Sequence, residues 1–216
     1  VGAIHACFFA ATADIADKIT HGEVAKNLLT ILPGKRLDQV EQELVDAGYS
    51  KAQAAAALKV SNYVGSSALS SLPAGKSLEG YLFPDSFQKM TDTPATTIVR
   101  ESLEEMASNL TPQIIAGFHK QGLSTYQGIT LASIVEQESG KASDDPIVAQ
   151  VFLLRLKKGM PLGSDVTAAY ASAKVGQPFN PSISSAYNTR LVKGLPPGPI
   201  GTVSATSLSS VPTPAH

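Results

Sequence analysis

The sequence is poor in several residue types that mark common classes of protein. It has one cysteine, Cys7, so it can form no internal disulfide, and it has no tryptophan. Its 17 basic and 18 acidic residues nearly cancel, without a large basic cluster, so the surface charge that attracts nucleic acid is missing. The longest apolar run, VGAIHACFFAA, has about half of the roughly 20 residues that cross a bilayer. Disulfide-stapled, nucleic-acid-binding and membrane-spanning classes are therefore disfavoured.

Signatures of metal and nucleotide chemistry are also missing. The sequence contains no H-E-x-x-H, no G-x-S-x-G and no G-x-x-x-x-G-K-[ST]. Its four histidines are scattered along the chain: His5, His21, His119 and His216. Scattered histidines are more typical of surface or core positions than of metal ligands. We therefore expect neither a metal nor another cofactor.

What the sequence does have is enough apolar residues for a core and two separable regions. The 216 residues are 43% hydrophobic and 16% charged, which suits one large domain or two small ones. The first region predicts a helix ending near Gly22, a strand within 24–34, a helix at 35–48 and a helix at 50–60 capped by Ser50. Residues 61–76 are rich in serine, glycine and proline, which is typical of a linker or a domain boundary. A small α+β unit is thus predicted ahead of a second region.

The second region is predicted to be mainly helical. Its patterns predict helices at 94–109, 111–121 and 124–139, a helix from Asp145 to Gly159, a short helix capped near Ser164, and a strand-like stretch at 185–201 that ends in a proline-rich loop. Asp145 is expected to be the N-cap of its helix, with Pro146 in the first helical position. The tail after residue 203 has no strong closing element.

Two glutamates end an apolar helical segment, ITLASIVEQESG, at residues 129–140. On a helical wheel Glu136 and Glu138 lie about 200° apart, so they cannot act together as paired carboxylates on one bond. Unpaired carbonyls in the last helical turn disfavour an ionised carboxylate, and an apolar wall beside Glu136 would disfavour it further. A protonated Glu136 would suit general-acid catalysis. The alternative is an ordinary exposed glutamate at a helix end.

Four segments occur in an order typical of one enzyme family. They are EGYLFPDSF, LASIVEQESG, VAQVFLLRLKKGMPL and YNTRLVKGLPPGPI, and together they resemble the MltG-type (YceG-like) endolytic murein transglycosylases over most of residues 30–208. The resemblance implies an α+β protein with a small LysM-like α+β module at 1–75, followed by a mainly helical catalytic domain with a small β component at 76–216. Since the family's chains usually extend further, we expect both domains to be cut short at their outer ends.

The resemblance also implies a reaction. Such enzymes cleave the β-1,4 bond between N-acetylmuramic acid and N-acetylglucosamine within peptidoglycan glycan strands, without consuming water. The family's single glutamate aligns with Glu136, which is expected to act as acid and then as base while the muramyl 6-hydroxyl closes a 1,6-anhydro ring. An internal hydroxyl replaces the water that a second carboxylate would activate, in agreement with the wheel.

Further site residues follow from the same resemblance. The substrate-binding set is Asp165, Tyr187, Asn188 and Thr189, and the supporting set is Glu79, Glu138 and Ser164. Tyrosine beside an amide suits sugars, because their apolar faces stack and their hydroxyls need fixed partners. Asp165 has the alternative of a helix N-cap. This chain has Gly163 where the family usually has glutamine, which removes one polar group from the expected site.

The resemblance also implies which molecules the protein meets. The partners are glycan strands and peptidoglycan synthases, with no nucleic acid, and the membrane is reached only through an anchor absent from this chain. The catalytic domain is expected to face the periplasm or the extracellular side.

One alternative is a hydrolytic muramidase, with Asp165 or Asp85 as its second carboxylate. The other is a peptidoglycan-binding or scaffolding protein without turnover.

Overall fold

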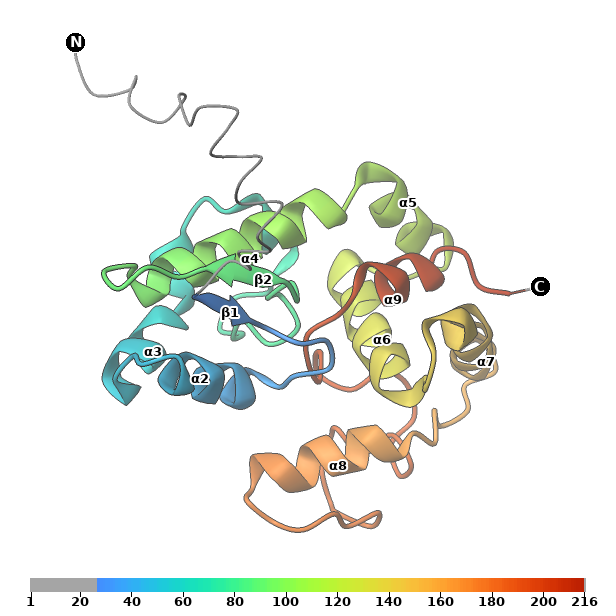
Figure 1. Cartoon of the computed structure of the whole chain (residues 1–216). Helices are drawn as coiled ribbons and strands as arrows, with labels where there is room; N and C mark the ends of the chain where they lie inside the picture. Colours follow the sequence, from blue (N-terminus) through green and yellow to red (C-terminus); the bar gives the residue numbers. More distant parts are fainter. Residues whose placement is uncertain (1–26, 216) are drawn as a thin grey trace.

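The protein is mainly helical, with one small sheet (Figure 1). The computed structural model describes residues 27–215; Cys7 and the helix expected near Gly22 lie outside them. In chain order the elements are β1 (Leu28–Thr30), α2 (Leu37–Asp46), α3 (Lys51–Ala57), the 3-10 helices η1 (Val60–Tyr63) and η2 (Ser67–Ser71), β2 (Ser86–Gln88), α4 (Ala95–Asn109), α5 (Pro112–Lys120), α6 (Thr125–Glu138), the 3-10 helix η3 (Ala142–Asp144), α7 (Asp145–Lys157), α8 (Asp165–Lys174) and α9 (Ala205–Ser210). The predicted α+β class is confirmed.

Several helices begin where their capping residues predict. The Ser124 hydroxyl accepts a hydrogen bond from the Gln127 amide at 3.2 Å, which closes a capping box on α6. Ser50 forms a capping box on α3, and the Thr111 hydroxyl accepts from the Ile114 amide at the start of α5. Side-chain oxygens at these positions satisfy amide donors that have no partner within the helix. The predicted starts of all three helices are confirmed.

The sheet joins the two predicted regions. Strands β1 and β2 pair antiparallel, with Leu29 opposite Phe87, although β2 lies beyond residue 76. The segment expected to be a linker or boundary, 61–76, contains most of η1 and all of η2 and packs on the body, because Tyr63 and Ala68 are buried. The boundary at residue 75 and the LysM-like identity of the first part stay predictions.

Two expectations for the last third of the chain are wrong. The part of 185–201 before the proline-rich loop forms no strand; its ladder contact is a single bridge between Pro161 and Lys193, and the amides of Leu191 and Val192 donate to the Asn188 carbonyl in a turn. The tail does have a closing element, because α9 buries Leu208, and Val211 is buried just after it. Apolar burial stabilises a helix that is too short to be stable alone.

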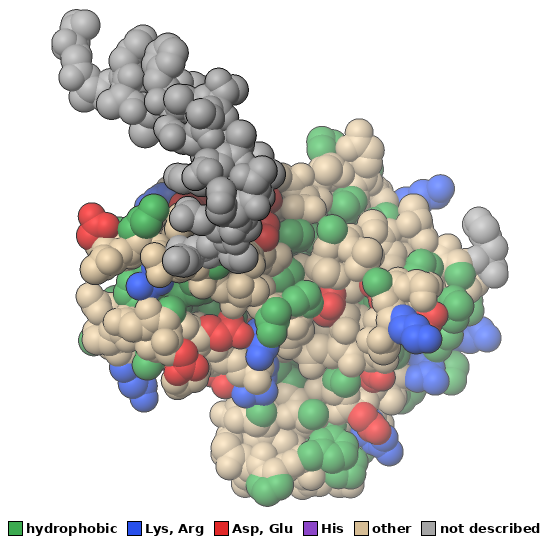
Figure 2. Space-filling model, in the orientation of Figure 1, with side chains coloured by type: hydrophobic (Ala, Val, Ile, Leu, Met, Phe, Trp, Pro, Cys, Tyr) green, Lys and Arg blue, Asp and Glu red, His purple; other side chains and the backbone are tan. Residues whose placement is uncertain are grey.

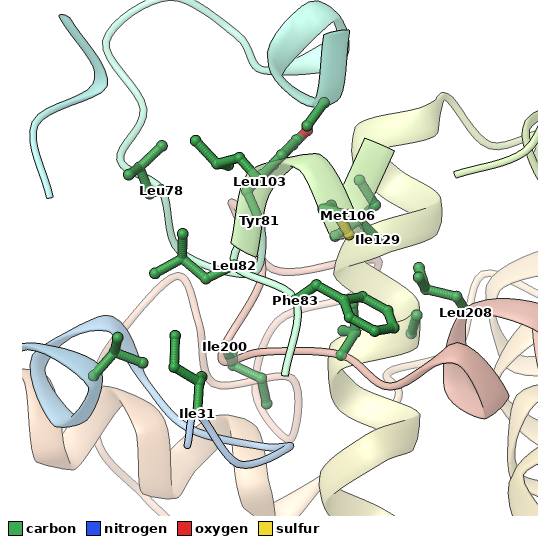
Figure 3. Packing of buried hydrophobic residues seen from close by; sticks show 14 of the residues in the cluster. Ile31, Leu78, Tyr81, Leu82, Phe83, Leu103, Met106, Ile129, Ile200 and Leu208 are labelled. Atoms are coloured by element: carbon green, nitrogen blue, oxygen red, sulfur yellow. The ribbon is translucent and has the colours of Figure 1, made fainter. Parts of the chain in front are cut away.

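Helix α6 lies at the centre of the helical part (Figure 1). Every residue from Gly128 to Val135 is buried, as expected for a helix that is apolar all round. Helices α5, α7, α8 and α9 all contact it. Figure 3 shows Ile129 of α6 near Met106, Phe83 and Leu208, which come from three other segments. Within residues 27–215, no helix has both the length and the apolar composition needed to cross a membrane.

Candidate functional site

Glu136 lies in the last turn of α6, half-buried, against the start of α9. Its Oε2 accepts three hydrogen bonds: from the Ser204 amide at 2.9 Å, the Ser204 hydroxyl at 2.5 Å and the Ser207 hydroxyl at 2.7 Å. The apolar wall considered from the sequence is replaced by hydroxyl and amide donors. These donors fix the position of the carboxyl group.

The other oxygen of Glu136, Oε1, differs from Oε2 in its contacts. Within residues 27–215, Oε1 has no hydrogen-bond partner, and no lysine, arginine or histidine nitrogen lies within 4.0 Å of this carboxyl group. A carboxyl group held by one oxygen can present the other to a ligand without losing its orientation. This arrangement suits proton transfer to or from a bound molecule.

The proline-rich loop places the start of α9 over Glu136. The loop runs along α6, where the Ser133 hydroxyl accepts from the Ile200 amide at 3.0 Å and Gln137 Nε2 donates to the Ile200 carbonyl at 3.0 Å. Gly201 passes so closely that a Cβ would lie 2.8 Å from Gln137 Nε2 and 2.9 Å from the Gly34 carbonyl oxygen. Only glycine fits such an approach without displacing its neighbours. The sequence GPIG therefore determines where Ser204 meets Glu136.

Asp145 lies near Glu136, which the sequence analysis did not predict. The N-cap of α7 is Asp144, so the prediction that Asp145 caps this helix is wrong. Asp145 is only 2% exposed and accepts from the Ser139 hydroxyl. Its Oδ2 also lies 2.9 Å from Ser207 Oγ, whose single proton can go either to this oxygen or to Glu136 Oε2. Ser207 thus contacts both Glu136 and Asp145.

Glu138 faces a different neighbour from Glu136. Its side chain is exposed, and its Oε1 accepts from the Ser164 hydroxyl at 2.6 Å. Ser164 is the N-cap residue of α8, but its side chain makes no capping hydrogen bond because it points to Glu138 instead. This contact joins the end of α6 to the start of α8. The two glutamates therefore contact different elements, as the helical wheel predicts.

The predicted substrate-binding residues lie around the start of α8. Asp165 is the first residue of this helix, not its N-cap, and its exposed carboxylate forms an ion pair with Arg190. Tyr187 is half-buried, with its ring centroid 4.8 Å from that of Tyr170. Asp85 accepts from the Ser86 amide at 2.7 Å. Neither Asp85 nor Asp165 shares a hydrogen-bond partner with Glu136.

Asn188 and Thr189 are buried, and their polar atoms bond within the chain. Asn188 Nδ2 donates to the carbonyls of Pro181 and Ile183, at 3.1 and 2.8 Å. The Thr189 and Thr167 hydroxyls lie 2.8 Å apart. These contacts hold the loop against α8. Direct sugar contact by either residue stays a prediction.

Glu79 is 6% exposed, and both of its oxygens are occupied. Oε1 accepts from the Leu37 amide, the first of α2, at 2.9 Å, and Oε2 accepts from the Tyr170 hydroxyl at 3.0 Å. Burial raises the pKa of Glu79 to about 7, against the opposing effect of these two donors. Glu79 therefore ties α2 to α8, which fits its predicted supporting role.

A cavity of about 980 Å³ lies at the other end of α6. Tyr126, Lys157 and Pro197 are among its lining residues. Tyr126 precedes Glu136 by ten residues, or about 15 Å along a helix. The cavity and the Glu136 carboxyl group are therefore separate features. In the view of Figure 2, acidic and basic side chains are interspersed without one dominant charged patch.

A metal centre was not expected from the sequence. Within the described residues, no group of three or more histidine, cysteine, aspartate and glutamate side chains is arranged to hold a metal ion. The donors to Glu136 are two serine hydroxyls and one backbone amide. This neighbourhood suits hydrogen bonding to a carboxyl group and a polar ligand.

Comparisons of this chain with known proteins agree on one family. The YceG-like family matches residues 10–216. An endolytic murein transglycosylase of Streptococcus pneumoniae D39 is 34% identical over 155 residues, covering 66% of this chain and 28% of the relative. One of Bacillus subtilis 168 is 29% identical over 209 residues, covering 89% of this chain and 58% of the relative. The chain thus spans less than two thirds of the length of either relative.

A solved structure also matches. The crystal structure of a yceG-like protein from Listeria monocytogenes superposes with a TM-score of 0.72 at 29% identity, covering 95% of this chain and 72% of that one. This likeness extends over both regions that the sequence analysis separates.

Proposed function

The chain belongs to the YceG-like family, and on this premise we propose that it is an endolytic lytic transglycosylase of peptidoglycan. The relatives from Streptococcus pneumoniae and Bacillus subtilis are named endolytic murein transglycosylases. The observation that carries the proposal is the Glu136 carboxyl group, with Oε2 held by three donors and Oε1 free within the described residues. A single fixed acid with one available oxygen is what this reaction needs.

Glu136 acts twice in the proposed mechanism. Protonated Glu136 gives its proton to the glycosidic oxygen between N-acetylmuramic acid and N-acetylglucosamine, and the bond from that oxygen to the anomeric carbon breaks. The muramyl 6-hydroxyl oxygen then bonds to the anomeric carbon, and the ionised Glu136 takes the hydroxyl proton. The products are a free N-acetylglucosamine 4-hydroxyl and a 1,6-anhydro end, and Glu136 is protonated again.

Ser204 and Ser207 support this acid in the proposal. Their hydrogen bonds to Oε2 stabilise Glu136 while it is ionised and keep Oε1 oriented between the two proton transfers. The second carboxyl group near Glu136 is Asp145, which is buried behind Ser207. A buried aspartate is badly placed to activate a water molecule on the far side of a sugar ring. This geometry favours the transglycosylase over a hydrolytic muramidase.

The substrate fixes where the protein would act. Peptidoglycan strands lie outside the cytoplasmic membrane, so the proposed site of action is its outer side, facing the periplasm or the extracellular space. We also propose that the protein is anchored in the membrane and acts beside peptidoglycan synthases. Two side chains are proposed to contact the strand: exposed Asp165, the first residue of α8, and half-buried Tyr187, whose ring lies beside Tyr170 of the same helix.

Product analysis tests the function. Polymeric, uncross-linked peptidoglycan would be incubated with the parent chain, with Glu136→Gln and with a control, Glu105→Gln, which alters an exposed glutamate on α4. We expect anhydro-muramyl ends by mass spectrometry with the parent and the control, and none with Glu136→Gln. Reducing ends would mean hydrolysis. Bound but uncleaved strands with all three proteins would support a binding protein without turnover.

A further inference from the structure

The proposed mechanism leaves one cavity of the protein unused. Its volume is about 980 Å³, and it lies where the ends of α5 and α7 meet the start of α6 (Figure 1). Leucines and prolines supply much of its wall, among them Leu153, Leu154 and Pro196. Leu154 is 46% exposed, so the cavity presents an apolar side chain to solvent. A cavity of this size, with apolar walls and a few polar groups, suits a bound organic molecule.

The charged side chains of the cavity all have one sign. Lys120 and Lys157 line it, and no described lining residue is acidic. Within residues 27–215, no carboxylate oxygen lies within 4.0 Å of either ammonium group. Each lysine lies in the last turn of its helix, where a cation is favoured, but that preference does not explain why both line one cavity. The cavity therefore suits a ligand that carries negative charge.

The uncharged polar side chains of the cavity are mainly amides. Gln121, Gln127 and Gln150 line it, and a glutamine side chain both donates and accepts hydrogen bonds. A peptide bond likewise offers one donor and one acceptor. Amide side chains beside leucines and lysines therefore match an extended peptide that has small apolar side chains and carboxylates.

The proposed substrate carries such a peptide. In peptidoglycan the lactyl carboxyl group of N-acetylmuramic acid is joined to a short peptide stem through an amide bond, so the glycan backbone of such a strand is uncharged. The stem is rich in alanine and carries carboxylates, one of them at its free end. The negative charge that would pair with the cavity lysines therefore lies on the stem and not on the sugars.

We propose that the cavity binds the peptide stem of a peptidoglycan strand, with stem carboxylates paired to Lys120 and Lys157. This inference rests on the proposed function, because it takes peptidoglycan as the substrate. Tyr126, in the cavity wall, lies about 15 Å along α6 from Glu136. An extended peptide covers about 3.4 Å per residue, so a stem of about five residues spans about 17 Å. A stem on the strand at Glu136 is therefore long enough to reach the cavity.

The proline-rich loop joins the cavity to the acid. Pro197 lines the cavity, and the same loop continues to Ser204 beside Glu136. The Tyr126 hydroxyl donates to the Pro197 carbonyl at 3.2 Å, and a Cβ at Gly198 would lie 2.3 Å from the Tyr126 hydroxyl oxygen. The loop is thus held closely against α6 at the cavity, and its prolines restrict its backbone. These contacts fix the position of the cavity relative to Glu136.

Binding of the stem alone is the primary test. The probe is the soluble N-acetylated peptide Ala-γ-Glu-Lys-Ala-Ala, with the D configuration at its glutamate and its last two alanines. We expect it to shift the backbone amide NMR signals of cavity residues such as Gln121 and Gly194. The double variant Lys120→Gln, Lys157→Gln is expected to bind about fivefold more weakly or worse, since two exposed ion pairs are lost. Lys51→Gln, which alters an exposed lysine on α3, is the matched control.

Two changed probes test which chemistry the cavity recognises. The same peptide with its terminal carboxylate converted to an amide is expected to bind about threefold more weakly or worse. Equal affinities of the two peptides would overturn the proposed ion pairs. An oligosaccharide of N-acetylglucosamine without peptide is expected to leave the cavity signals unchanged. Cavity shifts with this oligosaccharide and none with the peptide would make the cavity a sugar site and overturn the proposal.

Kinetics give the second readout. Peptide-bearing strands, and strands stripped of their peptides by an amidase, would be cleaved in parallel. We expect the parent to have the lower KM for peptide-bearing strands, and the double variant to lose that difference. Because the NMR experiment needs no turnover, the two failures are distinct. A parent that binds the peptide but makes no anhydro ends would contradict the transglycosylase reaction alone, whereas cleavage without peptide binding in the cavity would overturn the stem site alone.

Discussion

Glu79 and Glu136 are two glutamates that each accept a hydrogen bond from an amide at the start of a helix, yet they end in different situations. Glu79 accepts from Leu37 of α2, and Glu136 accepts from Ser204 before α9. Glu79 is 6% exposed and bonds through both oxygens. Glu136 is half-buried and bonds only through Oε2 within the described residues. Glu79 uses its second carboxyl oxygen to hold the fold together, whereas the second oxygen of Glu136 is available to a ligand.

The largest expected effect is the loss of activity on substitution of Glu136. Glu136→Gln is expected to lower the rate of glycan cleavage by about 10² to 10⁴, because the amide cannot deliver a proton. The unfolding free energy should change little, since the amide oxygen can still accept from Ser204. Product formation and urea unfolding of the same preparation would check both. A variant that cleaves normally would remove Glu136 from the chemistry.

The converse is expected for Glu79. Glu79→Ala leaves the Leu37 amide and the Tyr170 hydroxyl without their acceptor in the interior, and we expect a loss of about 3 kcal/mol in unfolding free energy. Urea unfolding measures it. Activity per folded molecule should remain. A stable variant that cannot cleave would place Glu79 in the site and break the distinction between the two acids.

The pH dependence of stability refines the account of Glu79. Burial raises its pKa from 4.5 to about 7, so the folded chain binds this proton more tightly than the unfolded chain. The contribution to stability is full below the unfolded pKa and is lost as pH rises through about 7; it amounts to at most about 3 kcal/mol. Glu79→Gln keeps the neutral form at every pH. The parent should therefore lose stability relative to Glu79→Gln between about pH 5 and about pH 8, and parallel unfolding curves would refute the assignment.

The smallest expected effect concerns the surface pair of Asp165 and Arg190. Both side chains are exposed, so Arg190→Ala should change the unfolding free energy by less than about 1 kcal/mol. If Asp165 contacts the strand, Asp165→Asn should raise KM with little change in kcat. Equal KM values for the parent and Asp165→Asn would limit the site to the neighbourhood of Glu136.

Local signals predicted the parts of the fold that depend on local chemistry. Ser50, Thr111 and Ser124 mark helix starts because capping needs only residues a few positions apart. The divergence of Glu136 and Glu138 was likewise predictable from helical periodicity. Asp145 was misread because an aspartate before a proline usually caps a helix, and only the folded chain shows Ser139 and Ser207 beside it.

The other parts of the fold and of the site depend on tertiary contacts. Helix α9 has only six residues, four of them serine or threonine with weak helical propensity, and it forms over Glu136 because its apolar side packs against α6 and α7. The serine-rich segment 61–76 was predicted to be a linker or a domain boundary; it packs on the body because Tyr63 and Ala68 are buried. The serines of SATSLSS were the one available signal of donors for an acid. Their partners could not be predicted without the path of the proline-rich loop.

The most direct test of the central claim is a crystal structure of Glu136→Gln with an uncleaved glycan strand. We expect the glycosidic oxygen of one N-acetylmuramic acid to lie within hydrogen-bonding distance of the side-chain atom of residue 136 that does not face Ser204. A strand bound at the opposite end of α6, in the cavity beside Tyr126 and Lys157, with residue 136 untouched, would contradict the account.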